Sequence, residues 1–351
     1  MSAMQTRKIQ QVGGGTYTVS LPKEWATAAD IEPGAVVALH SHIDGTLVVQ
    51  TGVESEADPL TLSVADTDPA SLERTLRAAY TAGVDSIELV SPDGATESTH
   101  RRVDRVTRAL TGVTVTDPSD DGMQVRSLLD VEEVSITQSV RQLQFTALSA
   151  HREATAALTA PAPDAAAGQA DGTDRIAAMV DHYFQRGLDS LSVMDALGLT
   201  RPELFDRWVT ASELARVADH ADRIAAVADR LDAPVDAALA DDVETLADRS
   251  RDLVQDAVGV VLDGGETTDR TDDAATDAVQ GLLDERDQLC ADIKEFDRRL
   301  FETDGADYRL THAVDALRGT AEAAGTVAEV GLRSLLRERC SSTSVDAGRA
   351  P

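Results

Sequence analysis

Residues 213–228 read ELARVADHADRIAAVA and hold the clearest periodic pattern in the chain. Apolar side chains recur there at spacings of three and four residues, which places them on one face of an α-helix. That face consists of Leu214, Val217, Ala221, Ile224 and Ala228. A second stretch repeats the stripe with Leu317, Ala321, Ala324, Ala328 and Gly331. The repetition predicts a mainly helical fold packed through small side chains.

The two stripes carry matching carboxylates. Asp219 follows Leu214 by five positions, and Glu322 follows Leu317 by the same interval. Because an α-helix turns by about 100° per residue, each carboxylate points away from its apolar stripe. We therefore expect an internal repeat in which each copy presents an acidic position.

The helical pattern extends from residue 133 almost to the end of the chain. Proline and glycine interrupt it at 160–163, 198–202, 263–265 and 303–305. These breaks predict six long helices in two groups of three, at 134–158, 173–195 and 203–231, then at 236–262, 272–301 and 307–338. We expect residues 133–340 to form one helical domain and residues 341–351 a disordered tail.

Residues 6–50 show the pattern of short strands with one helical turn. Gly13 to Gly15 suit a hairpin turn, and Asp44-Gly45 marks a second one. The segment 16–21 alternates polar and apolar residues, so Tyr17, Val19 and Leu21 are expected on a buried face and Thr16, Thr18 and Ser20 on the outer face. This N-terminal module, residues 1–52, has too little core to stand alone, and obligate dimerisation is expected.

Residues 57–130 predict a small α/β domain. Strands are expected at 60–64, 86–90, 113–116 and 123–128, with helices at 69–82 and 99–110. The order β-α-β-α-β-β is typical of a small sandwich of sheet and helices. No motif in this segment indicates a particular ligand.

The charge of the chain is strongly negative but unevenly distributed. The formal net charge is −30, and the only lysines are Lys8, Lys23 and Lys294. Such an acidic, lysine-poor composition is typical of proteins from extreme halophiles. Residues 1–23 nevertheless contain three cationic side chains and no acid. This segregation favours contact between the N-terminal module and a polyanion.

Several classes of protein are not expected. The N-terminus lacks the zones of a signal peptide, and no uninterrupted apolar stretch approaches 18 residues, so we predict a cytoplasmic protein without membrane insertion. Cys290 and Cys340 have no CxxC spacing, which indicates neither a disulfide scaffold nor a zinc site. Phosphate-binding loops, nucleophile elbows and H-E-x-x-H motifs are missing, so an enzyme is not expected.

The segment from Lys8 to Trp25, above all GGTYTVSLPKEW at 14–25, resembles the AbrB and SpoVT swapped-hairpin family. The resemblance covers residues 6–50. It implies that two chains interleave their hairpins into one β-barrel whose basic loops rest on duplex DNA. In such a dimer Arg7, Lys8 and Lys23 are expected to contact phosphates, while Gln10, Gln11, Thr16, Thr18 and Ser20 reach base edges.

Residues 133–338 are similar to the PhoU family, whose fold is two three-helix repeats. The similarity rests on RPELFD at 201–206 and on 214–225, which resembles the pattern Leu-Glu-Arg-Ile-(Ala/Gly)-Asp-His-Ala-x-x-Ile-Ala. The family often binds iron, zinc or similar ions through Glu-x-x-x-Asp on the third helices. The resemblance therefore raises a divalent or ferric ion as a cofactor.

This chain departs from the ligand pattern of the family. Ala215 stands at the Glu position of the first copy, and Arg318 and Glu322 stand at the Glu and Asp positions of the second. The remaining candidate metal ligands are Asp219, Asp222 and Glu322. The alternative is a solvated acidic surface on which Arg318 pairs with Glu322, four residues later.

Together the two resemblances imply a phosphate-responsive transcriptional regulator. Its expected partners are duplex DNA, a second copy of the chain, and either a phosphate-transporter ATPase of the ABC type or a signalling protein. One alternative is an adaptor that negatively regulates phosphate transport and uses the barrel only to dimerise. A further alternative is a metalloenzyme.

Overall fold

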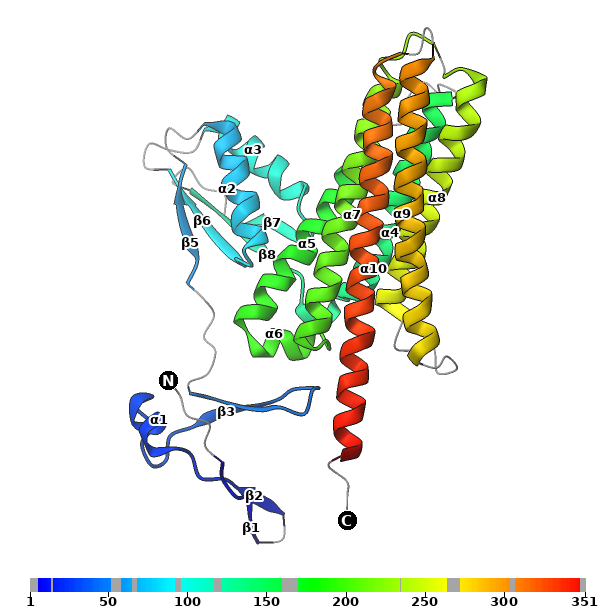
Figure 1. The fold of residues 1–351 in the computed structure, drawn as a ribbon. Coiled ribbons are helices and arrows are strands. Elements are labelled where there is room, and N and C mark those ends of the chain that lie inside the picture. Colours follow the sequence, from blue (N-terminus) through cyan, green and yellow to red (C-terminus); the bar gives the residue numbers. More distant parts are fainter. Residues whose placement is uncertain are drawn as a thin grey trace. The chain divides into compact units, whose positions relative to one another are not determined.

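The computed structural model describes residues 6–13, 15–51, 58–64, 68–91, 96–116, 122–159, 170–233, 235–263, 272–303 and 307–347. The chain divides into two compact units, residues 1–57 and residues 58–351. Figure 1 labels the elements, and the fold is mainly helical with a small N-terminal β-hairpin region.

The N-terminal unit consists of two hairpins and a short helix. Strands β1 (Gln10–Val12) and β2 (Thr16–Thr18) pair antiparallel, as do β3 (Val37–Ser41) and β4 (Leu47–Thr51). Helix α1 (Lys23–Ala28) follows Pro22, whose fixed φ suits a helix start. Gly45 in the second turn has a φ of 81°, a conformation that glycine adopts without strain.

No apolar side chain in the described part of this unit is fully buried. Tyr17 is 72% exposed, and Val19 and Leu21 are 47% and 41% exposed. These three side chains are thus exposed in the single chain, and the burial expected of them requires a second copy. The physical reason is that a hairpin of two strands has no second layer of its own to cover its apolar face.

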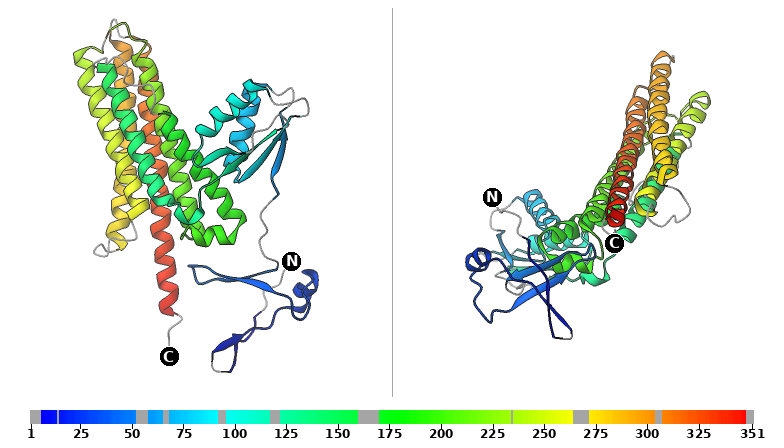
Figure 2. Two further views of the ribbon diagram at one scale, coloured as in Figure 1. Left: turned by 180° about the vertical axis from the view of Figure 1, so that it is seen from behind. Right: turned by 60° about the horizontal axis from the view of Figure 1, so that its bottom comes forward.

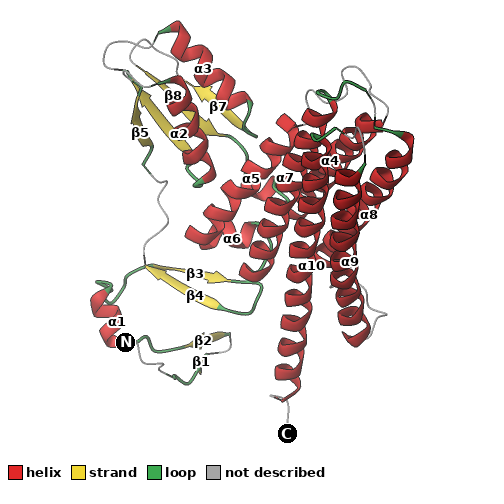
Figure 3. Ribbon diagram, turned by 45° about the horizontal axis from the view of Figure 1, so that its top comes forward, coloured by secondary structure: helices red, strands yellow, loops and turns green. Residues whose placement is uncertain are grey.

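The second unit begins with a two-layer α/β segment. Its elements are β5 (Leu60–Ser63), α2 (Pro69–Thr81), β6 (Ser86–Val90), α3 (Glu97–Arg108), β7 (Val113–Thr116) and β8 (Gly122–Ser127). The predicted order of these six elements is confirmed. The sheet order is β5-β6-β8-β7, with β5 parallel to β6 and the other pairs antiparallel. Helices α2 and α3 lie side by side (Figure 3), over a core that includes Leu76, Ile87 and Val103.

The rest of this unit is a bundle of long helices. After the short 3₁₀ helix at Val131–Glu133, it contains α4 (Ile136–Thr159), α5 (Ala170–Asp189), α6 (Leu191–Ala196), α7 (Arg201–Ala228), α8 (Ala237–Asp263), α9 (Asp272–Glu302) and α10 (Leu310–Ala347). Helices α4, α5 and α7 contact one another, as do α8, α9 and α10. The two groups meet through α7 with α10 and α4 with α8. Figure 2 shows the long helices side by side in two further views.

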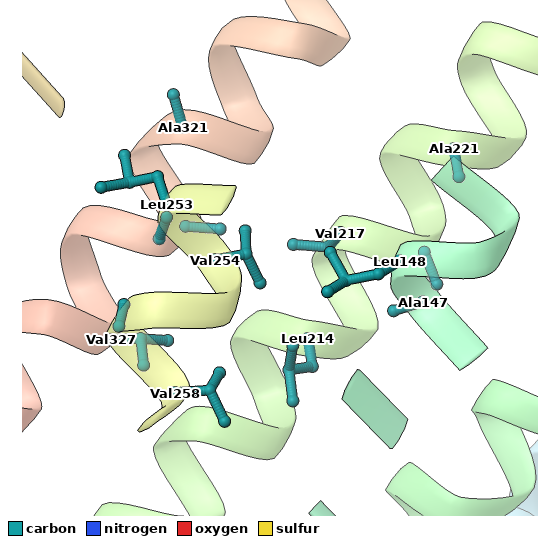
Figure 4. Packing of buried hydrophobic residues seen from close by; sticks show 14 of the residues in the cluster. Ala147, Leu148, Leu214, Val217, Ala221, Leu253, Val254, Val258, Ala321 and Val327 are labelled. Atoms are coloured by element: carbon teal, nitrogen blue, oxygen red, sulfur yellow. The ribbon is translucent and has the colours of Figure 1, made fainter. Parts of the chain in front are cut away.

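The predicted apolar stripes form the centre of the bundle. Leu214, Val217 and Ala221 of α7 are 1% exposed, and Ala321 and Ala324 of α10 are 0% and 1% exposed. Figure 4 shows the α7 stripe beside Leu253, Val254 and Val258 of α8, with Ala321 and Val327 of α10 close by. The spacing predicted that each stripe is buried, and the structure shows both stripes, on α7 and on α10, within one core.

Two boundaries differ from the sequence analysis. The second predicted helix, 173–195, is divided at Ser190, whose side chain accepts a hydrogen bond from the backbone N–H of Val193 and thereby caps α6. Helix α10 continues to Ala347, past residue 340 and into the predicted disordered tail. Residues 348–351 lie outside the described ranges, as do the predicted breaks at 160–163, 264–265 and 304–305. None of the described helices has an apolar stretch long enough to cross a bilayer.

Candidate nucleic-acid interface

The β1–β2 hairpin sorts the predicted DNA-contacting residues onto two faces. Its register pairs Gln10 with Thr18, Gln11 with Tyr17, and Val12 with Thr16. Directly paired residues share a face, and successive residues alternate between faces. Gln10, Thr16 and Thr18 therefore lie on one face with Val12, whereas Gln11 lies on the other face with Tyr17. The structure thus groups three of the predicted base-contacting residues and separates Gln11 from them.

All eight predicted DNA-contacting residues are exposed. They are Arg7, Lys8, Gln10, Gln11, Thr16, Thr18, Ser20 and Lys23. Gly13, in the turn between the strands, has a φ of 69°, and a Cβ atom there would meet nothing within 4 Å. The turn therefore uses the left-handed backbone of glycine and is sterically open on its outer side.

The same unit exposes an unusual amount of apolar surface for its size. Val36, Leu39 and Leu47 are 83%, 62% and 59% exposed, in addition to Tyr17 and its neighbours. Apolar surface of this extent is normally covered by a partner. The hairpin unit is therefore a candidate interface for a second chain as well as for a nucleic acid.

The predicted metal ligands lie on exposed helix faces. Asp219 and Asp222 lie on α7, and Glu322 lies on α10. Partial burial, followed by the charges of Asp219 and Asp174, raises the pKa of Asp222 above its usual value. Within the described ranges, no group of three or more His, Cys, Asp or Glu side chains is placed to hold a metal ion. Arg318 Nε lies 3.8 Å from Glu322 Oε1, which is the helix ion pair that the spacing predicted.

A buried polar cluster inside the bundle was not predicted. His151 of α4 is 0% exposed, and Arg251 Nη1 of α8 donates hydrogen bonds to His151 Nδ1 at 3.2 Å and to Thr155 Oγ1 at 3.0 Å. Burial, and then the charge of Arg251, lowers the pKa of His151 to about 3. Because Arg251 donates to Nδ1, the proton of the neutral ring is assigned to Nε2, which is buried without a partner in the described structure.

A signal for this cluster is present in the sequence. His151 lies four residues after Ala147 and three before Ala154, and Arg251 has the same relation to Ala247 and Val254. Both polar residues therefore occupy positions of the apolar stripes. Their pairing across two helices depends on how α4 and α8 pack, which helical periodicity does not specify.

A cavity of about 790 Å³ opens between α4, α8, α9 and α10. Its walls are about equally apolar and polar: Phe145, Leu262 and Val279 line it together with the ion pair between Arg141 and Asp263. Gly259 of α8 also lines it, and a Cβ atom there would meet nothing within 4 Å. The cavity has the size of a small-molecule site.

Comparison with known proteins identifies the N-terminal unit alone. Residues 10–56 match the family described as antidote-toxin recognition MazE, bacterial antitoxin. The match supports a hairpin domain of the AbrB and MazE kind at this end of the chain, which is consistent with dimerisation or DNA binding. No curated protein and no solved structure matches the chain.

Proposed function

We propose that this protein is a dimeric DNA-binding regulator whose N-terminal unit contacts the duplex and whose helical unit senses phosphate status. The observation that carries the DNA-binding part is the combination of charge and exposure in residues 7–23. These residues hold three cations and no acid in a chain of net charge −30, and their predicted contact residues are all exposed.

Dimerisation is supported by the burial pattern of the N-terminal unit. A domain of about 50 residues needs a shared or reinforced core to fold stably. The described part of this unit buries no apolar side chain fully, while Tyr17, Leu39 and Leu47 are more than half exposed. A second copy that pairs its hairpins with these side chains supplies the missing core. Two-fold symmetry then presents two copies of the cationic segment to the duplex.

The sensory part of the proposal rests on the PhoU-like sequence of residues 201–225 and on the grouping of the long helices into two contacting triplets. The helical unit would report phosphate status by binding a phosphate-transporter ATPase or a signalling protein. Transcript profiling of a strain that lacks the gene tests this part. Phosphate-uptake transcripts that respond normally to phosphate limitation would count against it.

The DNA-binding part is tested with the full chain and a pool of random-sequence duplexes. After rounds of selection, anisotropy titrations compare a selected duplex with a scrambled one at several potassium chloride concentrations. Lys8→Gln is the test variant. Lys294→Gln is the matched control, because Lys294 is an exposed lysine on α9.

We expect Lys8→Gln to weaken binding and to reduce the salt dependence of the affinity by about one contact per chain. Lys294→Gln should bind as the wild type does. If selection enriches no sequence and Lys8→Gln behaves like the wild type, the adaptor alternative is favoured. In that alternative the N-terminal unit serves only to dimerise.

A further inference from the structure

Helix α3 carries positive charge in a chain dominated by carboxylates. Four arginines fall within eight residues, at 101, 102, 105 and 108, against two acids, Glu97 and Asp104. The formal charge of the helix is therefore +2, whereas that of the whole chain is −30. A surface selected only for solubility in such an acidic protein would not concentrate arginine in one helix.

The arginines occupy the side of α3 that faces away from the core. Arg101, Arg105 and Arg108 follow one another at spacings of four and three residues, so they span only about 60° of the helix circumference. Val103 and Val106, on the opposite side, are 0% and 5% exposed and pack into the core of the α/β segment. Packing therefore fixes the rotation of α3, and the arginine row faces solvent.

The ion pairs on α3 engage only two of its four arginines. Arg101 lies 3.9 Å from Glu97, and Arg108 lies 2.5 Å from Asp104. Arg102 and Arg105 form no ion pair with any residue that the structure describes. The side chains of Arg101 and Arg108 are 71% and 80% exposed. Exposed pairs of this kind contribute at most about 1 kcal/mol, so a phosphate group can displace the carboxylates.

The dimensions of the arginine row suit a nucleic-acid backbone. Seven residues of helix rise by about 10 Å, the axial length over which one strand of a DNA duplex carries about three phosphates. Guanidinium groups bind phosphate oxygens in bidentate fashion and stay charged at any physiological pH. α3 contains no Phe, Tyr or Trp for stacking on bases, and its one imidazole, His100, is partly buried. The row is thus equipped for sequence-independent contact with duplex phosphates.

We propose that the arginine row of α3, Arg101, Arg105 and Arg108 with Arg102 at its flank, is a second DNA-binding surface that contacts the phosphate backbone. This inference rests on the proposed DNA-binding function and adds to it a contact outside the N-terminal unit. The row contributes affinity without sequence preference. The hairpin unit supplies the contacts that distinguish one sequence from another.

The test uses the full chain with the double substitution Arg101→Gln and Arg105→Gln. The matched control is Arg223→Gln with Arg298→Gln, which removes the same charge from exposed positions on α7 and α9. Affinities for a selected and a scrambled duplex are measured across a range of potassium chloride concentrations. Mass photometry reports the oligomeric state, and circular dichroism verifies that both variants are folded.

We expect the α3 variant to bind both duplexes more weakly by the same factor and to reduce the slope of log affinity against log salt by about 2 for each chain. The control should keep the wild-type slope. An α3 variant with the wild-type slope, bound to DNA as the wild type is, overturns this inference and leaves the proposed function standing. A smaller oligomer with an unchanged slope also overturns it, because α3 would then contact an acidic surface of another copy. If the wild type binds no duplex, the proposed function itself fails and this inference fails with it.

Discussion

The imidazole ring of His220 on α7 packs directly against Gly319 on α10. A Cβ atom at residue 319 would lie 2.4 Å from Nε2 and 2.5 Å from Cε1 of that ring. Nδ1 of His220 is buried, which leaves the ring little room to move. Helices α7 and α10 thus approach each other closely at Gly319, where only glycine fits.

Substitution of Gly319 tests this close approach. Gly319→Ala should lower the free energy of unfolding by about 1–3 kcal/mol, because the added methyl group overpacks the contact. Gly281→Ala on α9 is the control, since a Cβ atom there meets nothing within 4 Å. It should raise the free energy of unfolding by up to about 1 kcal/mol through helix propensity. Denaturant unfolding measures both, and a stabilising Gly319→Ala would contradict the packing.

His151 should make the stability of the helical bundle depend on pH. Its pKa is lowered to about 3 in the fold, from an ordinary value of 6.5. The unfolded state therefore binds the proton more readily, and the contribution of His151 is complete above pH 6.5 and lost progressively as the pH falls towards 3. The loss is at most about 1.4 kcal/mol per pH unit. His151→Asn keeps an acceptor near Nδ1 but does not titrate.

The measurement is the difference in unfolding free energy between the wild type and His151→Asn at pH 7.5 and pH 5. We expect the wild type to lose stability relative to the variant over this interval. Other titrating groups are common to both proteins and cancel in the difference. An equal loss in the two proteins would show that His151 is protonated without penalty.

Tyr17 should contribute to self-association. Tyr17→Ser removes apolar surface from the exposed hairpin face and should raise the dimer dissociation constant at least about tenfold, equivalent to ~1.4 kcal/mol. Tyr308→Ser is a matched control, because Tyr308 on the second unit is 73% exposed and Tyr17 is 72% exposed. Analytical ultracentrifugation over a range of concentrations measures both. Equal dissociation constants would show that the hairpin face is not the dimer interface.

The buried carboxylate of Asp206 depends on Arg337. Asp206 on α7 is 3% exposed and forms a hydrogen-bonded ion pair with Arg337 on α10. Burial raises the pKa of Asp206, and Arg337 opposes that rise. Arg337→Gln should lower the free energy of unfolding at pH 7 by about 2 kcal/mol. This loss is smaller than for a fully buried pair, because the arginine side chain is 39% exposed to solvent.

The double variant Asp206→Asn with Arg337→Gln separates the loss of the pair from the cost of an unpaired charge. It should be more stable than Arg337→Gln alone, since no buried carboxylate then lacks its cation. Lowering the pH should also restore stability to Arg337→Gln, because Asp206 becomes protonated and neutral. A double variant less stable than the single one would contradict this account.

Helices, strands and turns could be predicted from the sequence, because they depend on interactions between residues close together along the chain. The stripe of Leu214, Val217 and Ala221 predicted a helix with one buried face, and those residues are buried in the bundle. The alternation around Tyr17 predicted a strand. Tyr17 is exposed in the single chain. Alternation identifies an apolar face, but it does not identify what covers that face.

The cationic segment at residues 1–23 could also be recognised from the sequence, since charge is a property of the residues themselves. The arginine row of α3 was not recognised from the sequence, although all four arginines are visible in it. Their significance depends on the rotation of the helix, which is set by the packing of Val103 and Val106 on the sheet. The arginines form one exposed surface only because the opposite face of α3 is buried in the core.

Periodicity and composition alone thus determined that this chain has a long helical region and a small strand-rich N-terminal module whose first 23 residues hold three cations and no acid. The tertiary structure decided which residues meet: Arg251 with His151, Arg337 with Asp206, and Gly319 with His220. These pairs lie 100, 131 and 99 positions apart along the chain. Local preferences extend over a few residues, whereas such pairings arise only when whole helices pack against one another.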